Sequence, residues 1–346
     1  MSNPDNASNS SSLERLPGLI VAQTSFIVVT SLLILVGNVI NIVVLHSSRL
    51  WHHSTTVLLK NLSVVDCCIG LSFTVLAVYP SAADLSEWPY GDAMCTVTSF
   101  IGGTCCGASV ITLALISVDR YFIILRPMDY RRHLTPRKTY LFVALSWIIP
   151  AGLHAMVLLG KDSRKVFSYY NEDAFLCSVH YSEIRSLTAV LFFFIFVPTN
   201  LVTIAAYCPI IRASLRHSKL IRLSRLHESS AAAKKDTCFM LSSKSNKAVL
   251  TLLIITVVFN LCWAPTAISV SLEAIGLVDH LSRNVEFICA WLAMSNSFSN
   301  SFVYLVMNSK YRKAVKKLFQ RNRIMEYFPQ HTPSTPCLNS ILNTHV

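Results

Sequence analysis

Seven long apolar segments alternate with short polar loops along the chain. They lie near residues 19–46, 55–82, 93–125, 139–160, 186–212, 245–272 and 286–307. Each is long enough to cross the roughly 30 Å hydrocarbon core of a bilayer as a helix. Because lipid offers no hydrogen-bond partner to the backbone, a spanning segment must satisfy its own amides. The pattern therefore predicts an all-α membrane protein, a bundle of seven transmembrane helices.

The third apolar segment has a composition that suits a signal path across the membrane. It starts near Cys95, carries no charged residue before Asp119, and ends in Asp119-Arg120-Tyr121. A helix rises 1.5 Å per residue, so the step from Cys95 to Arg120 covers about 37 Å, more than the hydrocarbon core. The two ends therefore lie at opposite interfaces, and movement of this helix can connect an extracellular event with a cytoplasmic one.

Basic residues are distributed unequally between the loops, and this asymmetry predicts the orientation. The loops after spans one, three, five and seven carry most of the Lys and Arg, and the opposite loops carry few. Cytoplasmic loops are enriched in these residues. We therefore expect a multi-pass protein of the plasma membrane with an extracellular N-terminus and a cytoplasmic C-terminus. The net charge of +12 follows this topology and does not indicate a nucleic-acid partner.

Composition agrees with a membrane protein and divides the chain into four regions. Only 14% of the residues are charged, against about 25% in soluble domains. The expected regions are an extracellular N-terminus at 1–18, a seven-transmembrane domain at 19–310, an amphipathic membrane-surface helix at 311–323 and a disordered cytoplasmic tail at 324–346. In the first region, Asn6 and Asn9 each begin an Asn-X-Ser tripeptide, so both are candidate glycosylation sites.

The segment at 311–323 separates apolar from basic residues around a helix. Val315, Leu318 and Phe319 share one face, and Lys and Arg take the other. Such a helix lies in the interface of an anionic leaflet. We expect membrane lipid to be its partner, with a solvated basic tail as the alternative.

Motifs in all seven spans resemble the rhodopsin family (class A) of G-protein-coupled receptors across residues 19–323. They are Gly37-Asn38, Leu62-Ser63-Val64-Val65-Asp66, Asp119-Arg120-Tyr121, Trp147, Pro198, Cys262-Trp263-Ala264-Pro265 and Asn300-Ser301-Phe302-Val303-Tyr304. The resemblance implies a receptor without enzymatic activity that signals to a heterotrimeric G protein. Arrestin and a receptor kinase are further implied partners.

The resemblance also implies roles for individual residues. An extracellular disulfide would join Cys95 to Cys177. The implied G-protein coupling switch consists of Asp119, Arg120, Tyr121, Tyr207 and Tyr304. The implied activation switch consists of Phe259, Trp263 and Pro265. For Phe259 and Trp263, an aromatic core layer in a kinked helix is an equally compatible interpretation.

Asp66 is an ionisable residue within an apolar span and needs partners there. Insertion of such a group costs about 2.5–3.5 kcal/mol. The family's sodium pocket is matched by Asn38, Asp66, Ser109, Asn296, Ser297 and Asn300. A hard cation takes oxygen ligands of this kind, so Na⁺ is the only cofactor that we consider. A hydrogen-bonded polar cluster without an ion is the alternative.

Three departures from the family pattern point to a subfamily and to basal activity. Ser301 stands where most members have proline, and Tyr207 lies nine residues after Pro198, where eight is usual. Residues 244–247 contain no acidic residue to restrain Arg120, which predicts signalling without a ligand. The first two departures resemble a small pair of vertebrate orphan receptors, thought to act through the stimulatory G protein with little need of a ligand. The same resemblance extends to His52-His53-Ser54-Thr55-Thr56, Arg216-His217-Ser218-Lys219 and Ala293-Met294-Ser295-Asn296-Ser297-Phe298.

The expected ligand pocket lies near the extracellular ends of spans three, five, six and seven. Its lining would be small and weakly polar, comprising Gly102, Gly103, Cys106, Val190, Thr266, Ala267, Val270, Ala290 and Met294. Amine receptors carry a carboxylate at the position of Gly102, and opsins carry a lysine at that of Met294. The pocket therefore suits an apolar ligand, or is filled by Phe175 and Leu176 of its own loop. The alternative function is that of a receptor for an apolar or lipid-like small ligand with a different G-protein preference.

Other classes of membrane protein are less consistent with the sequence. A transporter or channel usually shows inverted repeats, broken helices or charged pore rings. An intramembrane enzyme would need His154 and serines to assemble a nucleophilic site. A decoy receptor that does not couple to a G protein conflicts with the intact Asp119-Arg120-Tyr121.

Overall fold

The computed structural model describes residues 16–47, 51–158, 168–179, 195–227, 232–274, 276–278 and 282–327. The predictions for Asn6, Asn9 and Val190 lie outside the described residues, as does most of the predicted tail.

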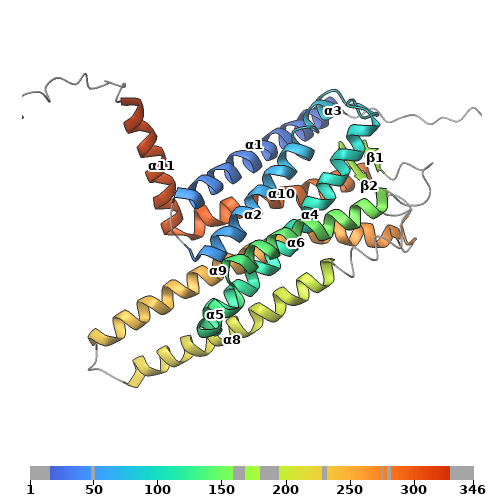
Figure 1. The fold of residues 1–346 in the computed structure, drawn as a ribbon. Helices are drawn as coiled ribbons and strands as arrows, with labels where there is room; N and C mark the ends of the chain where they lie inside the picture. Colours follow the sequence, from blue (N-terminus) through green and yellow to red (C-terminus); the bar gives the residue numbers. More distant parts are fainter. Residues whose placement is uncertain are drawn as a thin grey trace, which may run out of the picture.

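Seven helical spans form the bundle (Figure 1). They are α1 (Pro17–Ser47), α2 (His53–Ile69) continued by η1 (Gly70–Thr74) and α3 (Val78–Ala82), α4 (Asp92–Leu125), α6 (Pro136–Leu158), α8 (Val197–His227), α9 (Ala232–Ala274) and α10 (Arg283–Met307). Short α5 (Pro127–His133) follows α4, and α11 (Ser309–Tyr327) turns away from the bundle after α10.

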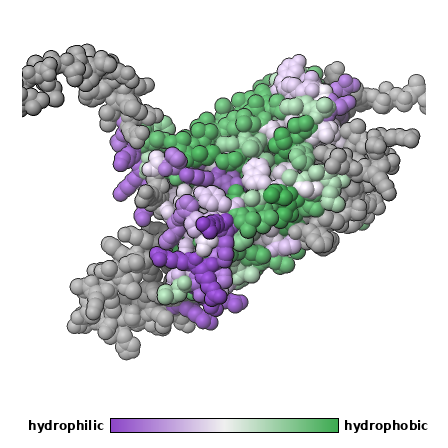
Figure 2. All heavy atoms as spheres, viewed as in Figure 1, coloured by the Kyte–Doolittle hydropathy of each residue, from purple (hydrophilic) through white to green (hydrophobic). Residues whose placement is uncertain are grey.

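The outer surface of the bundle is apolar over its middle and polar at its ends. Figure 2 shows a broad hydrophobic surface along the helices and a hydrophilic surface near α5 and the start of α11. Within the described residues, five helices have the length and mean hydropathy of a membrane span by themselves. In α10, Ser295, Asn296 and Asn300 are buried in the bundle. Its polar residues therefore face other helices, which lowers its mean hydropathy although its outer face is apolar.

Helix α4 is the central element of the bundle. It packs against α2, α6, α8 and α9 and also contacts the strands β1 and β2. Its close approach to α6 depends on glycine. A Cβ atom on Gly103 would lie 2.2 Å from His154 Nε2, and one on Gly107 would lie 2.5 Å from Pro150 Cβ. The missing side chains thus bring His154 directly against the backbone of α4.

The second span is not the continuous α-helix predicted at 55–82. It contains the π-helical turn η1, in which the Val75 amide donates to the Gly70 carbonyl at 3.0 Å. Farther along, Pro80 has no N–H for the Leu76 carbonyl, which accepts instead from the Tyr90 hydroxyl at 3.4 Å. The π turn changes the direction of the side chains that follow Gly70, including Phe73.

The structure adds two details to the predicted helical bundle. In the segment between α6 and α8, β1 (Ser168–Asn171) and β2 (Leu176–Val179) form an antiparallel hairpin. The helix predicted at 311–323 runs from Ser309 to Tyr327, so residues 324–327 belong to the helix and not to a disordered tail. It begins at Ser309 because the side-chain oxygen of Asn308 accepts the backbone N–H groups of Lys310 and Tyr311, both at 3.1 Å.

Candidate functional site

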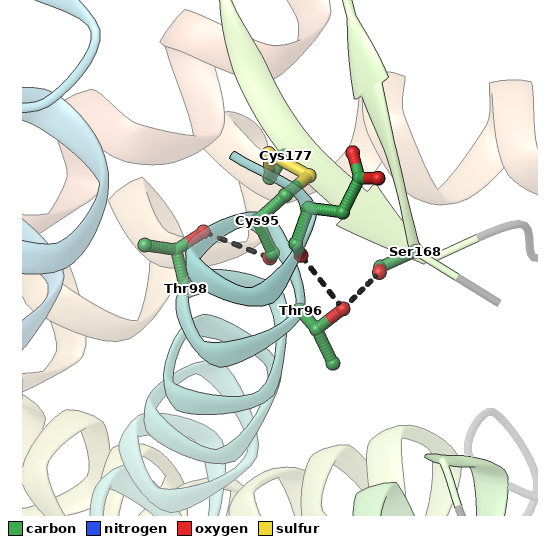
Figure 3. The surroundings of a disulfide bond; sticks show 6 residues. Cys95, Thr96, Thr98, Ser168 and Cys177 are labelled. Carbon is green, nitrogen blue, oxygen red and sulfur yellow. Dashed lines mark hydrogen bonds between the residues drawn. A yellow bond between two sulfur atoms is a disulfide. The ribbon is translucent and has the colours of Figure 1, made fainter. Parts of the chain in front are cut away.

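A disulfide bond fixes the hairpin to the N-terminal end of α4 (Figure 3). Cys95 on α4 and Cys177 on β2 are bonded, with their Cα atoms 5.3 Å apart. Beside them, the Thr96 and Ser168 hydroxyls lie 2.8 Å apart and join the same two elements. The predicted disulfide is confirmed, and it places the hairpin over the space between the helices.

A cavity of about 350 Å³ lies beneath the hairpin, between α4, α6, α9, α10 and the residues just before α8. Its lining includes the described members of the predicted set, namely Gly102, Gly103, Cys106, Thr266, Ala267, Val270, Ala290 and Met294. Leu176 forms part of the wall. Phe175 is buried to the side, with its ring centroid 6.5 Å from that of Phe287. The loop therefore covers the cavity without filling it.

The position of Gly102 is occupied by an aromatic ring from the second span. A Cβ atom on Gly102 would lie 1.7 Å from two ring carbons of Phe73. No acidic side chain can stand at Gly102 without displacement of this ring. The structure thus gives a steric reason, beyond the missing carboxylate, why an amine cannot be anchored there.

Ser99, His154 and Glu286 also line the cavity and were not in the predicted set. Sequence spacing alone does not reveal them, because α6 and the first turn of α10 carry no family motif at these positions. Glu286 accepts a hydrogen bond from the Asn171 side chain on β1. This contact ties the hairpin to α10 as well as to α4.

The predicted activation residues form a stack at the inner end of the cavity. The rings of Phe259 and Trp263 are 6.0 Å apart with an interplanar angle of 30°. Trp263 lines the cavity. Pro265 lies within α9, two residues after Trp263. Trp263 also packs against two hydrophobic clusters of buried residues, one that contains Phe259 and one that contains Phe287. A change in the cavity can therefore reach the core through this ring.

Asp66 is completely buried and only partly hydrogen-bonded. Its Oδ2 atom accepts from Asn300 Nδ2 at 2.9 Å. Its Oδ1 atom, Ser109 Oγ and Asn296 Oδ1 are buried and have no hydrogen-bond partner of normal geometry among the described residues. Helices α2, α4 and α10 thus each contribute one buried, unpartnered oxygen atom.

Asn38 and Ser297 hold α1 and α10 together next to this site. Asn38 Nδ2 donates to the backbone carbonyl of Ser297 at 2.9 Å and to that of Ile34 at 3.0 Å. The amide hydrogens of Asn38 are therefore used on backbone groups. Its contribution to the Asp66 site is to position α10, on which Asn296 and Asn300 lie.

Ser301 takes part in a hydrogen-bond chain that connects three helices. Asn41 Nδ2 on α1 donates to Ser301 Oγ on α10 at 2.7 Å. Asn41 Oδ1 accepts from the Tyr311 hydroxyl on α11. Sequence analysis missed Asn41 and Tyr311, whose contacts join positions 260 and 270 residues apart. A side-chain clamp thus holds the lower end of α10 where most of the family has proline.

We expect Asn41→Ala to destabilise the protein, because it leaves the buried Tyr311 hydroxyl and the partly buried Ser301 hydroxyl without their amide partner. Loss of such buried partners costs about 1–3 kcal/mol. The measurement is the thermal unfolding midpoint of the purified protein in detergent. Val39→Ala is the matched control on the same helix, since Val39 is 52% exposed on the outer surface. Equal midpoints for the two variants would contradict the clamp.

Arg120 is buried near the C-terminal end of α4 and is held by two neighbours. It is 5% exposed and pairs with Asp119 at 3.0 Å. Its NH2 group also donates to Thr55 Oγ1 at 2.6 Å. The Thr55 hydroxyl in turn donates to Asp119 Oδ2 at 2.6 Å. One hydroxyl from α2 therefore bridges the acid and the base, a role that the sequence did not indicate.

Tyr130 on α5, between α4 and α6, completes this cluster. Its hydroxyl donates to Asp119 Oδ1 at 3.1 Å. Burial, followed by the nearby Asp119, raises the pKa of Tyr130 to about 12. The phenol therefore remains a donor at neutral pH and connects the position of α5 to that of the acid–base pair.

Tyr207 and Tyr304 face the interior in the same hydrophobic cluster as Phe259. The direction of Tyr207, which its unusual spacing from Pro198 left open, is thus inward. Both tyrosines are buried, and both hydroxyls lack a hydrogen-bond partner in the described part of the chain. Tyr121 also packs against this cluster. Two unpaired hydroxyls in an apolar core are a costly arrangement that a rearrangement of α8 and α10 can relieve.

The architecture is that of a seven-transmembrane receptor. Residues 37–304 match the family model described as "7 transmembrane receptor (rhodopsin family)". The chain belongs to this family of G-protein-coupled signalling receptors, since the match covers more than half of its length. It is therefore a multi-pass membrane protein and a receptor, as predicted, rather than an enzyme.

Relatives and a solved structure agree with this assignment. The chain is 28% identical to "G-protein coupled receptor 52" of Bos taurus, over 86% of its own length and 81% of the relative's. It is 30% identical to "Probable G-protein coupled receptor 21" of Mus musculus, over 84% and 81%. It is 25% identical to "Histamine H2 receptor" of Homo sapiens, over 84% and 78%. The squid rhodopsin crystal structure has the same fold, with a TM-score of 0.74, 21% identity and coverage of 92% and 90%.

Proposed function

We propose that this receptor activates the stimulatory G protein, raises cAMP and does so at a high basal level without a ligand. The observation that carries the proposal is the weak restraint on Arg120. Among the described residues its only acidic partner is its own neighbour Asp119. Residues 244–247 offer no carboxylate, and Arg120 Nε has no partner. The resemblance to the orphan-receptor pair supports the stimulatory G protein.

The proposal includes an orientation and further partners. An extracellular N-terminus and a cytoplasmic C-terminus follow from the distribution of basic loops. The disulfide-linked hairpin is then outside, where oxidising conditions form such bonds. Helix α11 would rest on the inner leaflet, and a receptor kinase and arrestin would act on the cytoplasmic face.

Basal signalling is tested by giving Arg120 a second acidic partner. We expect Ser245→Glu or Asn246→Glu to lower ligand-independent cAMP, because a new ion pair between the glutamate and Arg120 stabilises the inactive state. A gain of about 1.4 kcal/mol would lower the active-to-inactive ratio tenfold. The measurement is cAMP per receptor at the surface of transfected cells, compared with mock-transfected cells.

The controls separate loss of coupling from loss of protein. Arg120→Ala should reduce cAMP to the mock level at normal surface expression, and Ser245→Gln should leave it unchanged. A wild-type signal no higher than mock would refute basal coupling. A signal in reporters for another G-protein class, with flat cAMP, would refute the stimulatory assignment and favour a receptor with a different G-protein preference.

We further propose that the site around Asp66 binds Na⁺. The donor set fits, because a carboxylate, a hydroxyl and an amide present unpartnered buried oxygen atoms there, and hard cations take oxygen ligands. Asp66, Ser109 and Asn296 would hold the ion, while Asn300 orients the carboxylate. A bound cation would supply positive charge that balances the buried carboxylate and links α2, α4 and α10.

We expect Na⁺ to lower the basal activity of the wild type and to have no effect on Asp66→Asn. A ligand that binds only the inactive state at ten times its dissociation constant shifts the ratio about tenfold. The measurement is G-protein activation by purified receptor when K⁺ is replaced by Na⁺ at constant ionic strength. Equal responses of the two proteins would favour a hydrogen-bonded cluster without an ion.

A further inference from the structure

The wall of the cavity beneath the hairpin contains two buried polar side chains whose hydrogen-bonding capacity is not fully used. Ser99 on α4 is 1% exposed, and its Oγ atom has no hydrogen-bond partner in the described residues. His154 on α6 is 5% exposed, and both residues line the cavity. Leaving a buried polar group unpaired costs about 1–3 kcal/mol. Such groups in a cavity wall therefore favour a ligand that pairs with them.

The chemistry of His154 is set by its hydrogen bond to the backbone. Its Nδ1 atom lies 2.8 Å from the Pro150 carbonyl oxygen, which can only accept. Nδ1 therefore carries the hydrogen, and Nε2 of the neutral ring is an acceptor. No protein donor reaches Nε2 in the described part of the chain. A ligand group here must donate a hydrogen bond.

Ser99 and His154 are placed to share one ligand group. His154 Nε2 lies against Gly103 on α4, which has no side chain to separate them. Ser99 is four residues before Gly103, so it lies about one turn away on the same face, roughly 5–6 Å. This spacing applies to the two side-chain positions along α4, and a bridging hydroxyl needs about 2.8 Å to each partner atom. A hydroxyl between them can donate to His154 and accept from Ser99.

The rest of the cavity does not favour a charged ligand at this wall. Gly102 is filled by the Phe73 ring, and Gly103, Cys106 and Val110 contribute no charge. The carboxylates of the lining are Glu273 and Glu286, near the end of α9 and the start of α10. Glu286 already accepts a hydrogen bond from Asn171. The charged groups are thus at the mouth, on the helices opposite α6.

We propose that the cavity binds a neutral, mainly apolar molecule whose hydroxyl group bridges His154 Nε2 and Ser99 Oγ. This inference rests on the proposed function as a receptor and names the chemical class of its ligand. The volume of about 350 Å³ is at the lower end of small-molecule pockets. The ligand is therefore compact, and its body would contact Trp263 at the inner end of the cavity.

The test uses three cage compounds of the same shape and different polar groups. They are 1-adamantanol, 1-fluoroadamantane, which cannot donate a hydrogen bond, and cationic 1-adamantanamine. Each is titrated into purified full-length receptor in phosphatidylcholine nanodiscs, and the unfolding midpoint gives an apparent affinity. One net neutral hydrogen bond corresponds to about two- to tenfold in affinity. We expect the alcohol to bind at least about twofold more tightly than the fluoride.

Variants identify the groups responsible. His154→Phe and Ser99→Ala should each remove the preference for the alcohol. Thr266→Val is the matched control, because it also removes a cavity hydroxyl, but one that already donates to the Cys289 carbonyl at 2.8 Å. It should keep the preference. Using two variants on different helices keeps the test decisive if one of them does not fold.

Several outcomes would overturn the inference. These are no measurable binding of the alcohol, equal binding of alcohol and fluoride to the wild type, tightest binding of the amine, or a preference that survives both variants. The readout is binding to the receptor itself. Failure here with intact basal cAMP would remove the ligand class alone, whereas alcohol binding by a receptor without a signal would remove the proposed coupling alone.

Discussion

Thr55→Val should increase ligand-independent G-protein activation. The Thr55 hydroxyl accepts from Arg120 and donates to Asp119, both at 2.6 Å. It therefore stabilises the buried position of the arginine. Hydrogen bonds to charged groups contribute about 1.5–3 kcal/mol, so their loss should raise the active-to-inactive ratio about tenfold or more. The measurement is nucleotide exchange on purified G protein by receptor in nanodiscs.

Thr55→Ser is the matched control, since it keeps the hydroxyl and removes only a methyl group. It should behave like the wild type. A double variant with Arg120→Ala should lose the gain, because the released side chain would then be absent. Equal exchange rates for the valine and serine variants would show that this hydroxyl does not restrain Arg120.

Cys177→Ser should cause a large loss of stability at the end of the bundle that carries the hairpin. The disulfide to Cys95 closes a loop with a sequence separation of 82. On the chain-entropy model, closing a loop of this length contributes about 4–5 kcal/mol. The hairpin should separate from α4, and the cavity should lose its cover. The expected result is a lower unfolding midpoint together with much reduced surface expression.

The wild type treated with a reducing agent provides the comparison for this variant. Reduction should lower its unfolding midpoint to that of Cys177→Ser and should not change the variant itself. Cys208→Ser is the control for loss of a thiol, because Cys208 is a free, exposed cysteine of α8. If Cys177→Ser and Cys208→Ser unfolded at the same temperature, the disulfide would have no structural importance.

Both predictions concern the ends of α4, and the sequence already indicated these ends. Its apolar stretch from Cys95 to Asp119 is dictated by the bilayer, which excludes unpaired charges from its core. The same constraint fixes the other spans and, through the basic loops, the predicted orientation. The family motifs then indicated the disulfide that the structure contains.

The second span shows where hydropathy is insufficient. Its apolar pattern is continuous, yet η1 and the turn before α3 interrupt it. The π turn orients Phe73 toward Gly102. Hydropathy reports that a residue is apolar and does not report its angle around the helix axis. The shape of the ligand cavity therefore could not be predicted from this segment.

By itself, the sequence determined which segments cross the membrane, because the bilayer stabilises each apolar segment separately, according to the length and composition of that segment. Only the tertiary structure decided which polar side chains meet. Thr55 reaches Arg120 and Asn41 reaches Ser301 from other helices, and Ser99 and His154 share a wall because Gly103 lets α6 approach α4. These contacts depend on helix rotation and separation, which are set by packing between residues far apart in the chain.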